Sequence, residues 1–147
     1  MKLIEELRLK SANETINRNN VIAEIKKAFD CYLSSEEFEN YLRRHIGAEE
    51  VKRRNFCVAV QFWEYHDGCT TTNFNCGGFT WYNPENKEGY TSRKYKGLEL
   101  RDINKEVCEY IANRLMARMR ELEFYYVFSE NLKGRLDYYH NLFYFGW

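Results

Sequence analysis

The sequence lacks the features that most often identify a function. It has no glycine-rich nucleotide loop, no Cys-x-x-Cys pair, and no hydrolase or kinase motif. Positive and negative side chains balance at 22 each, so no overall field attracts nucleic acid or a membrane surface. No apolar run approaches the roughly 20 residues of a membrane span. These absences leave local groups of arginine and aromatic side chains as the candidates for a binding function.

The sequence also lacks the signs of a secreted protein. Its first ten residues, "MKLIEELRLK", have acidic side chains where a signal peptide has a basic stretch and an apolar run. Five cysteines are an odd number, which is typical of free thiols in a reducing compartment. We expect a cytoplasmic protein with no disulfide, no cofactor and no membrane contact.

Aromatic residues are unusually abundant: 12 Tyr, 10 Phe and 3 Trp, beside a single Pro. Tyr and Trp combine a large apolar body with a polar group, so the excess suits a core, a self-association surface or a stacking site. The C-terminal segment "LDYYHNLFYFGW" has aromatic residues on both faces of a predicted strand. Because such a strand promotes aggregation unless it is covered, we expect a homo-oligomer, most simply a dimer.

Periodicity predicts helices in the first third of the chain. A polar stretch at 11–20 weakens the first helical pattern, which suggests a bent helix or two pieces. Apolar residues recur at helical spacing from Val21 to Leu33. Ser34 with Glu37 forms a capping-box pattern for a further helix.

Strand patterns follow at 56–66, 79–83 and 89–95, and the first of them is apolar on both faces, which predicts a central strand with both faces covered. A long helix with Asp102 as N-cap and a C-terminal hairpin complete the chain. The fold class is therefore α+β, with N-terminal helices and an antiparallel sheet of about five strands: a three-stranded meander, a long helix and a C-terminal hairpin. We expect one domain over 1–147, with a helical part at 1–47 and the sheet with its packed helix at 55–147.

The stretch 66–78, "HDGCTTTNFNCGG", holds His66, Asp67, Cys69 and Cys76. A closed zinc site needs four ligands in close pairs, and a cysteine nucleophile needs a base within hydrogen-bond reach. Neither pattern is visible, so we expect a polar hairpin loop with dispensable thiols, no metal and no catalytic residue. An enzyme that uses His66, Asp67 and Cys69 stays an alternative.

Two arginines of the long helix are candidate ligand-binding residues. Arg114 and Arg118 lie four residues apart at the border of the apolar stripe and can converge on a phosphate or carboxylate. Trp63, Trp81 and Tyr95 could stack a base on a sheet face. These five residues form the predicted site for a nucleotide-like anionic ligand. In the alternative interpretation, the arginines cover apolar surface and pair with Asp or Glu.

A second basic group, "RRHIGAEEVKRR" at 43–54, could contact nucleic acid. Glu49 and Glu50 interrupt it, and the net charge of the chain is zero. Nucleic-acid binding by an accessory protein is therefore a further alternative.

The segments "KSANETINRNNVIAEIKKAF" and "ANRLMARMRELEFYYVFSENLKGRLDYYHNLFYFGW" resemble small accessory proteins of tailed phages, of the anti-defence type. The shared features are an Ala- and Thr-containing opening helix, a later helix that runs into a Leu-x-Phe/Tyr strand, and a hairpin that ends on Trp. This resemblance implies a phage-encoded, non-enzymatic protein of the host cytoplasm. Such a protein would sequester a nucleotide signal or block a host defence protein, and the resemblance assigns no site residues.

Overall fold

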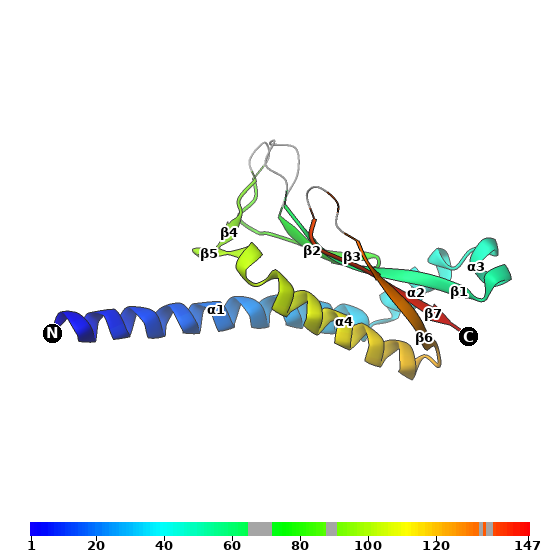
Figure 1. The fold of residues 1–147 in the computed structure, drawn as a ribbon, viewed down its shortest axis with the longest axis horizontal. Helices are drawn as coiled ribbons and strands as arrows, with labels where there is room; N and C mark the ends of the chain where they lie inside the picture. The colour runs from blue at the N-terminus through cyan, green and yellow to red at the C-terminus, as the bar shows by residue number, and fades with distance from the viewer. Residues whose placement is uncertain (65–71, 88–90, 133, 135–136) are drawn as a thin grey trace.

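The computed structural model describes residues 1–64, 72–87, 91–132, 134 and 137–147. Three helices precede the first strands, and a fourth helix separates those strands from the C-terminal hairpin (Figure 1). In chain order the elements are α1 (Leu3–Leu33), α2 (Glu36–His45), α3 (Ala48–Arg53), β1 (Asn55–Trp63), β2 (Asn73–Cys76), β3 (Phe79–Tyr82), β4 (Lys94–Tyr95), β5 (Leu98–Glu99), the 3-10 helix η1 (Leu100–Asp102), α4 (Asn104–Glu121), β6 (Tyr125–Asn131) and β7 (Asp137–Gly146).

Five strands form one antiparallel sheet in the order β3-β2-β1-β7-β6. The predicted α+β class, with its meander, long helix and C-terminal hairpin, is confirmed. The meander, however, consists of β1, β2 and β3, and its middle strand β2 lies inside the predicted loop. Phe74 and Cys76 alternate there with asparagines, a pattern too short to separate from a polar loop. The segment predicted as the third strand instead contributes β4 to a separate two-stranded hairpin with β5.

The C-terminal strand β7 is an interior strand. It pairs with β1 from Gly146 to Asp137 and with β6 on its other side. Both edges of this terminal strand are therefore paired, because the return of the chain inserts it between β1 and β6. The edge strand of the hairpin is β6.

Burial alternates strictly along β1. Phe56, Val58, Val60 and Phe62 are buried, and the residues between them are half-exposed. Helices α1 and α4 lie on the buried side of the sheet (Figure 1). The prediction of a central strand is confirmed, but the prediction that both of its faces are covered is wrong for the described residues. The aromatic and small residues on the second face of β1 predicted that this face is buried. No described helix covers it in the way that α1 and α4 cover the first face.

Helix α1 is one uninterrupted helix of 31 residues. The polar stretch at 11–20 contains neither Gly nor Pro, so nothing in it breaks the helical hydrogen bonds. Its C-terminal third packs in the core, while its N-terminal half is exposed and extends beyond the body of the molecule (Figure 1). Among the described helices, none combines the length and the apolar character that a membrane crossing requires.

Two helix starts differ from the sequence-based expectation by one residue each. Helix α2 begins at Glu36 with Ser35 as its N-cap, and α4 begins at Asn104 with Ile103 in that position. Asp102 instead ends the short 3-10 helix η1. The apolar stripe of α4 is confirmed, since its predicted residues are fully buried from Ile103 to Met119.

The turn between β2 and β3 fits closely against α2. Gly77 has a φ of +57°, and a Cβ there would lie 2.9 Å from Cε1 of Tyr41. Gly97 also has a positive φ, of +79°, but a Cβ there would meet nothing within 4 Å. A comparison of substitutions at the two glycines therefore distinguishes the cost of backbone strain from the cost of a steric clash.

We expect Gly77→Ala to lower the free energy of unfolding by about 2–4 kcal/mol, because strain of about 1 kcal/mol adds to a clash with Tyr41. Gly97→Ala should cost only about 1 kcal/mol. Urea denaturation of both variants measures the difference. Equal losses would contradict the close packing of the turn against α2.

Candidate functional site

The predicted reactive loop is described only in part. His66, Asp67 and Cys69, the residues of the alternative enzyme site, lie outside the described residues. Within the ranges that are described, no group of three or more His, Cys, Asp and Glu side chains is placed to hold a metal ion.

Cys76 is a core residue. It lies in β2, faces the helices and is fully buried. Burial raises the pKa of its thiol to about 12, so the thiol stays protonated at neutral pH. The expectation that Cys76 belongs to a dispensable loop is therefore wrong. The neighbouring Gly77 and Gly78 suggested that Cys76 lies in a loop. In the structure Cys76 pairs with Val60 and is therefore part of the sheet.

We expect Cys76→Ser to lower the free energy of unfolding by about 1–3 kcal/mol, because the more polar hydroxyl would be buried in an apolar core. Cys31→Ser is the matched control, since Cys31 is exposed and its replacement should change stability by less than about 0.5 kcal/mol. Chemical denaturation under reducing conditions compares the two. A Cys76→Ser variant as stable as the control would show that this position tolerates a polar group.

Arg114 and Arg118 are engaged within the chain. Nε of Arg114 donates to Oδ1 of Asp30 at 3.0 Å. Nε of Arg118 donates to the carbonyl oxygen of Leu33 at 2.8 Å, and its other nitrogens lie 3.1 and 3.5 Å from carboxylate oxygens of Glu121 and Glu39. These contacts join α4 to α1 and α2. They are the contacts that the alternative interpretation of the two arginines expects.

The three predicted stacking residues lie in two separate places. Trp81 and Tyr95 are 9% and 7% exposed, and their rings pack on each other with centroids 5.6 Å apart. The Tyr95 hydroxyl donates to Glu24 at 3.1 Å. Trp63 is half-exposed on the opposite face of the sheet. The described contacts therefore distribute the five predicted residues over three parts of the molecule.

The sheet face directed away from α1 and α4 carries side chains that are half-exposed or exposed, apart from the buried Asn73, and we call it the open face. Strand register assigns residues of all five strands to it. Across the sheet these are Thr80 and Tyr82; Asn73 and Asn75; Asn55, Cys57, Ala59, Gln61 and Trp63; Asp137, His140, Leu142 and Tyr144; and Tyr125, Phe128 and Glu130.

One end of the open face forms a polar cleft of about 520 Å³. Asp137 organises its β7 side: one carboxylate oxygen accepts from Nε2 of Gln61 at 2.8 Å, and the other lies 3.1 Å from Nδ1 of His140. On the far side, Nδ2 of Asn75 donates to the hydroxyl of Thr80 at 2.8 Å. The lining residues are Gln61, Trp63, Asn75, Thr80, Tyr82, Gly134 and Asp137. We call this hollow the open-face cleft.

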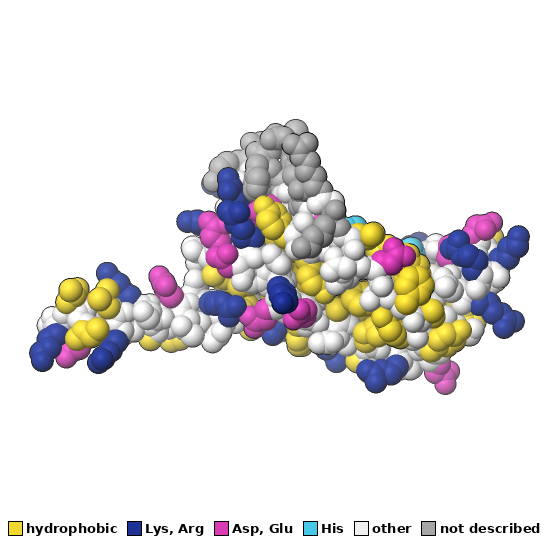
Figure 2. All heavy atoms as spheres, in the orientation of Figure 1, with side chains coloured by type: hydrophobic (Ala, Val, Ile, Leu, Met, Phe, Trp, Pro, Cys, Tyr) yellow, Lys and Arg dark blue, Asp and Glu magenta, His cyan; other side chains and the backbone are white. Residues whose placement is uncertain are grey.

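The other end of the open face is aromatic. Phe128 and Tyr144 stack with ring centroids 4.2 Å apart and planes inclined by 7°. Tyr125 is 56% exposed beside them. Figure 2 shows Lys and Arg side chains over α3 and toward the N-terminal end of α1, and further Lys and Arg side chains among the hydrophobic ones between these regions. The residues of the open face include two carboxylates, Asp137 and Glu130, and no Lys or Arg.

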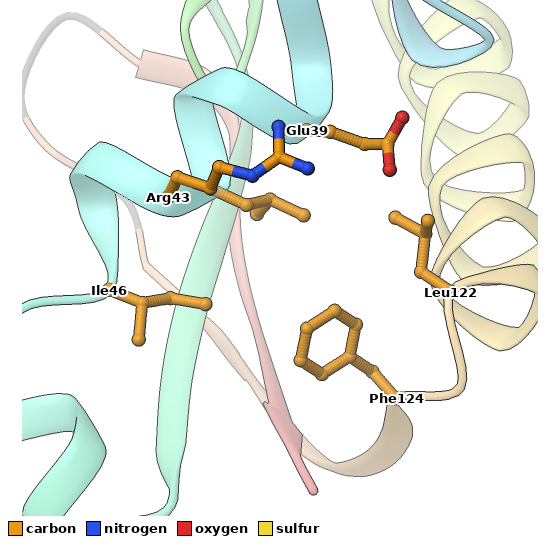
Figure 3. A pocket seen from close by; sticks show the side chains of 6 residues that line it. Glu39, Arg43, Ile46, Leu122 and Phe124 are labelled. Atoms are coloured by element: carbon orange, nitrogen blue, oxygen red, sulfur yellow. The ribbon is translucent and has the colours of Figure 1, made fainter. Parts of the chain in front are cut away.

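A second hollow lies between α2 and the junction of α4 with β6, and we call it the α2–α4 pocket (Figure 3). It has a volume of about 400 Å³ and apolar walls from Leu42, Ile46, Leu122 and Phe124. Glu39 and Arg43 stand at its mouth, the first in contact with Arg118.

Arg43 has a polar but uncharged partner. Its Nη1 donates to Oδ1 of Asn40 at 2.7 Å. Within the described residues, it forms no ion pair with a carboxylate.

Sequence reasoning found Trp63 but missed the rest of the open-face cleft. Gln61 alternates with the core residues Val60 and Phe62, and this alternation was the available signal for an accessible polar face. Asn75 was assigned to the loop, and Asp137 gains its role only from the pairing of β7 with β1. A scan of protein-family models and searches of curated proteins and of solved structures find no match to the chain.

We expect Arg118→Ala to lower the free energy of unfolding by about 2 kcal/mol, because the Leu33 carbonyl and two carboxylates lose a charged donor. Arg120→Ala is the control: Arg120 lies on the exposed side of the same helix. Its replacement should change stability by less than about 0.5 kcal/mol. Thermal and urea unfolding measure both variants, and equal stabilities would mean that Arg118 is not structural.

Proposed function

We propose that the protein is a non-enzymatic binding protein that blocks a partner protein by covering it with the open face of its sheet. The observation that carries the proposal is the exposure of a broad sheet face with aromatic and amide side chains, while the helices pack on the other face. Aromatic residues in such a position supply most of the binding energy in many protein interfaces.

Charge favours a particular kind of partner surface. Asp137 and Glu130 give the described open face a negative character, which Arg53 of α3 offsets only at the aromatic end, near Cys57 and Tyr144. A partner that presents Arg or Lys beside apolar groups would pair with these carboxylates and stack its guanidinium groups on Trp63 or Tyr82. A phosphate-bearing ligand would be repelled at the open-face cleft, since its described lining includes Asp137 and no Lys or Arg.

A nucleotide-like anion, the other occupant predicted from the sequence, would find cations beside the α2–α4 pocket on the helical side of the molecule. Arg118 contacts Glu39, which lies at the mouth of the α2–α4 pocket. Arg43 lies at the same mouth and forms no ion pair among the described residues. Capture of a nucleotide signal at that pocket is the second candidate function.

The blocking function agrees with the resemblance to small anti-defence proteins of tailed phages. A phage origin and action in a host cytoplasm are part of the proposal, and they rest on that resemblance. Nucleic-acid binding has less support, because α3 interleaves Glu49 and Glu50 with its basic residues and Arg53 pairs with Glu50 at 3.3 Å.

We expect the double variant Trp63→Ala/Tyr82→Ala to lose the partner protein. An aromatic side chain that is a main contact of an interface contributes about 2 kcal/mol or more, so partner recovery should fall at least about tenfold. The measurement is quantitative mass spectrometry of proteins that the immobilised wild-type and variant proteins retain from a bacterial lysate.

The matched control is Leu9→Ala/Ile16→Ala, which removes exposed apolar surface from the projecting half of α1 instead. It should retain the partner at the wild-type level. Recovery of the same proteins by the Trp63/Tyr82 variant would contradict the proposal. A nucleotide found on freshly purified wild-type protein by native mass spectrometry, and absent from Arg43→Ala, would favour the second candidate function.

A further inference from the structure

Strand β6 is a long edge of the sheet with no described neighbour on its outer side. It pairs with β7 alone, and six of its seven residues are exposed. The amide of Leu132, just beyond the strand, donates to the carbonyl of His140 at 2.7 Å. Because hydrogen-bonding direction alternates along an antiparallel strand, Ser129 and Asn131 direct their backbone N–H and C=O groups away from β7.

Strand β6 carries apolar side chains at positions where soluble proteins usually have residues that prevent pairing with another chain. Edge strands commonly carry Lys or Pro, or are very short, so that other chains do not pair with them. Four consecutive residues of β6, Tyr125 to Phe128, are 43–56% exposed, and Glu130 is the only charged residue of the strand. A register shift between Tyr126 and Phe128 bends the strand but leaves its later half regular.

We infer that β6 pairs with β6 of a second copy of this chain, in antiparallel orientation about a two-fold axis at Ser129. The two sheets then join into one continuous sheet. Phe128 of each copy faces Glu130 of the other, so no like charges meet across the junction. Centring the pair on Glu130 instead would oppose two carboxylates, which disfavours that register.

The exposed surface is large enough for a specific contact. A fully accessible aromatic side chain presents about 150–250 Å² and a valine less, so the four half-exposed side chains of β6 with Leu132 offer on the order of 500 Å² per copy. Together the two copies offer on the order of 1,000 Å², about the area that a specific protein interface must bury. Such a contact is expected to hold at micromolar concentration.

The two-fold axis is normal to the sheet, and both open faces therefore lie on the same side of the assembly. Two partner-binding surfaces would be presented together. The dimer itself does not depend on which partner the open face binds, and the experiment below tests it separately.

The first test is the mass of the protein in solution. Wild-type protein should have twice the chain mass of 17.8 kDa by light scattering at tens of micromolar. Ser129→Pro should be a monomer, because Ser129 does not use its N–H toward β7 and proline removes only the outward donor. Ser129→Ala keeps that donor and should stay dimeric. A monomeric wild type, or a dimeric Ser129→Pro, would overturn the inference.

Disulfide trapping tests the register without disturbing the backbone. In a Cys31→Ser background, Ser129→Cys brings two thiols onto facing residues with Cα atoms about 5.5 Å apart, within disulfide range. Mild oxidation should give a covalent dimer. Asn131→Cys places the two thiols about 13 Å apart and should give none. No cross-link at position 129, or equal cross-linking at both positions, would refute the proposed pairing even if the proline variant failed to fold.

Discussion

The pairing of β1 with β7 is the constraint on which the rest of the structure depends. These strands come from distant parts of the chain and form nine residue pairs, from Asn55 with Gly146 to Trp63 with Asp137. Their inward residues, such as Phe56 and Phe145, lie in the core that α1 and α4 cover. Once this pair is formed, the meander can extend only on the β1 side and the hairpin only on the β7 side. The edge position of β6 is a direct consequence.

The same pairing makes the two faces of the sheet unequal. One face receives the apolar stripes of both long helices, held together by the contacts of Arg118 and Arg114 with α1 and α2. The other face keeps its aromatic and amide side chains accessible. Asp137 joins Gln61 and His140 only because β7 lies beside β1. The open-face cleft is therefore built by the sheet, and no single segment of the chain contains it.

The open face and the β6 edge belong to one surface. Phe128 stacks on Tyr144 at the aromatic end of the open face, and its strand is also the proposed junction with a second copy. Joining two sheets there would extend the aromatic region across the junction and place the polar clefts at its two far ends. A repeated or two-lobed partner surface would suit such an arrangement, since two linked contacts raise the effective affinity without new interactions.

The sequence by itself determined the α+β class and the buried stripe of α4, because these follow from local periodicity and residue type. The sequence also predicted that the first strand is central, but it did not predict that only one face of that strand is buried. Only the tertiary structure decided which apolar strand is an edge and where each arginine points. It also decided that Cys76 is a core residue rather than a loop thiol. The physical reason is that strand order and ion-pair partners depend on contacts between residues far apart in the chain, and local patterns carry no record of those contacts.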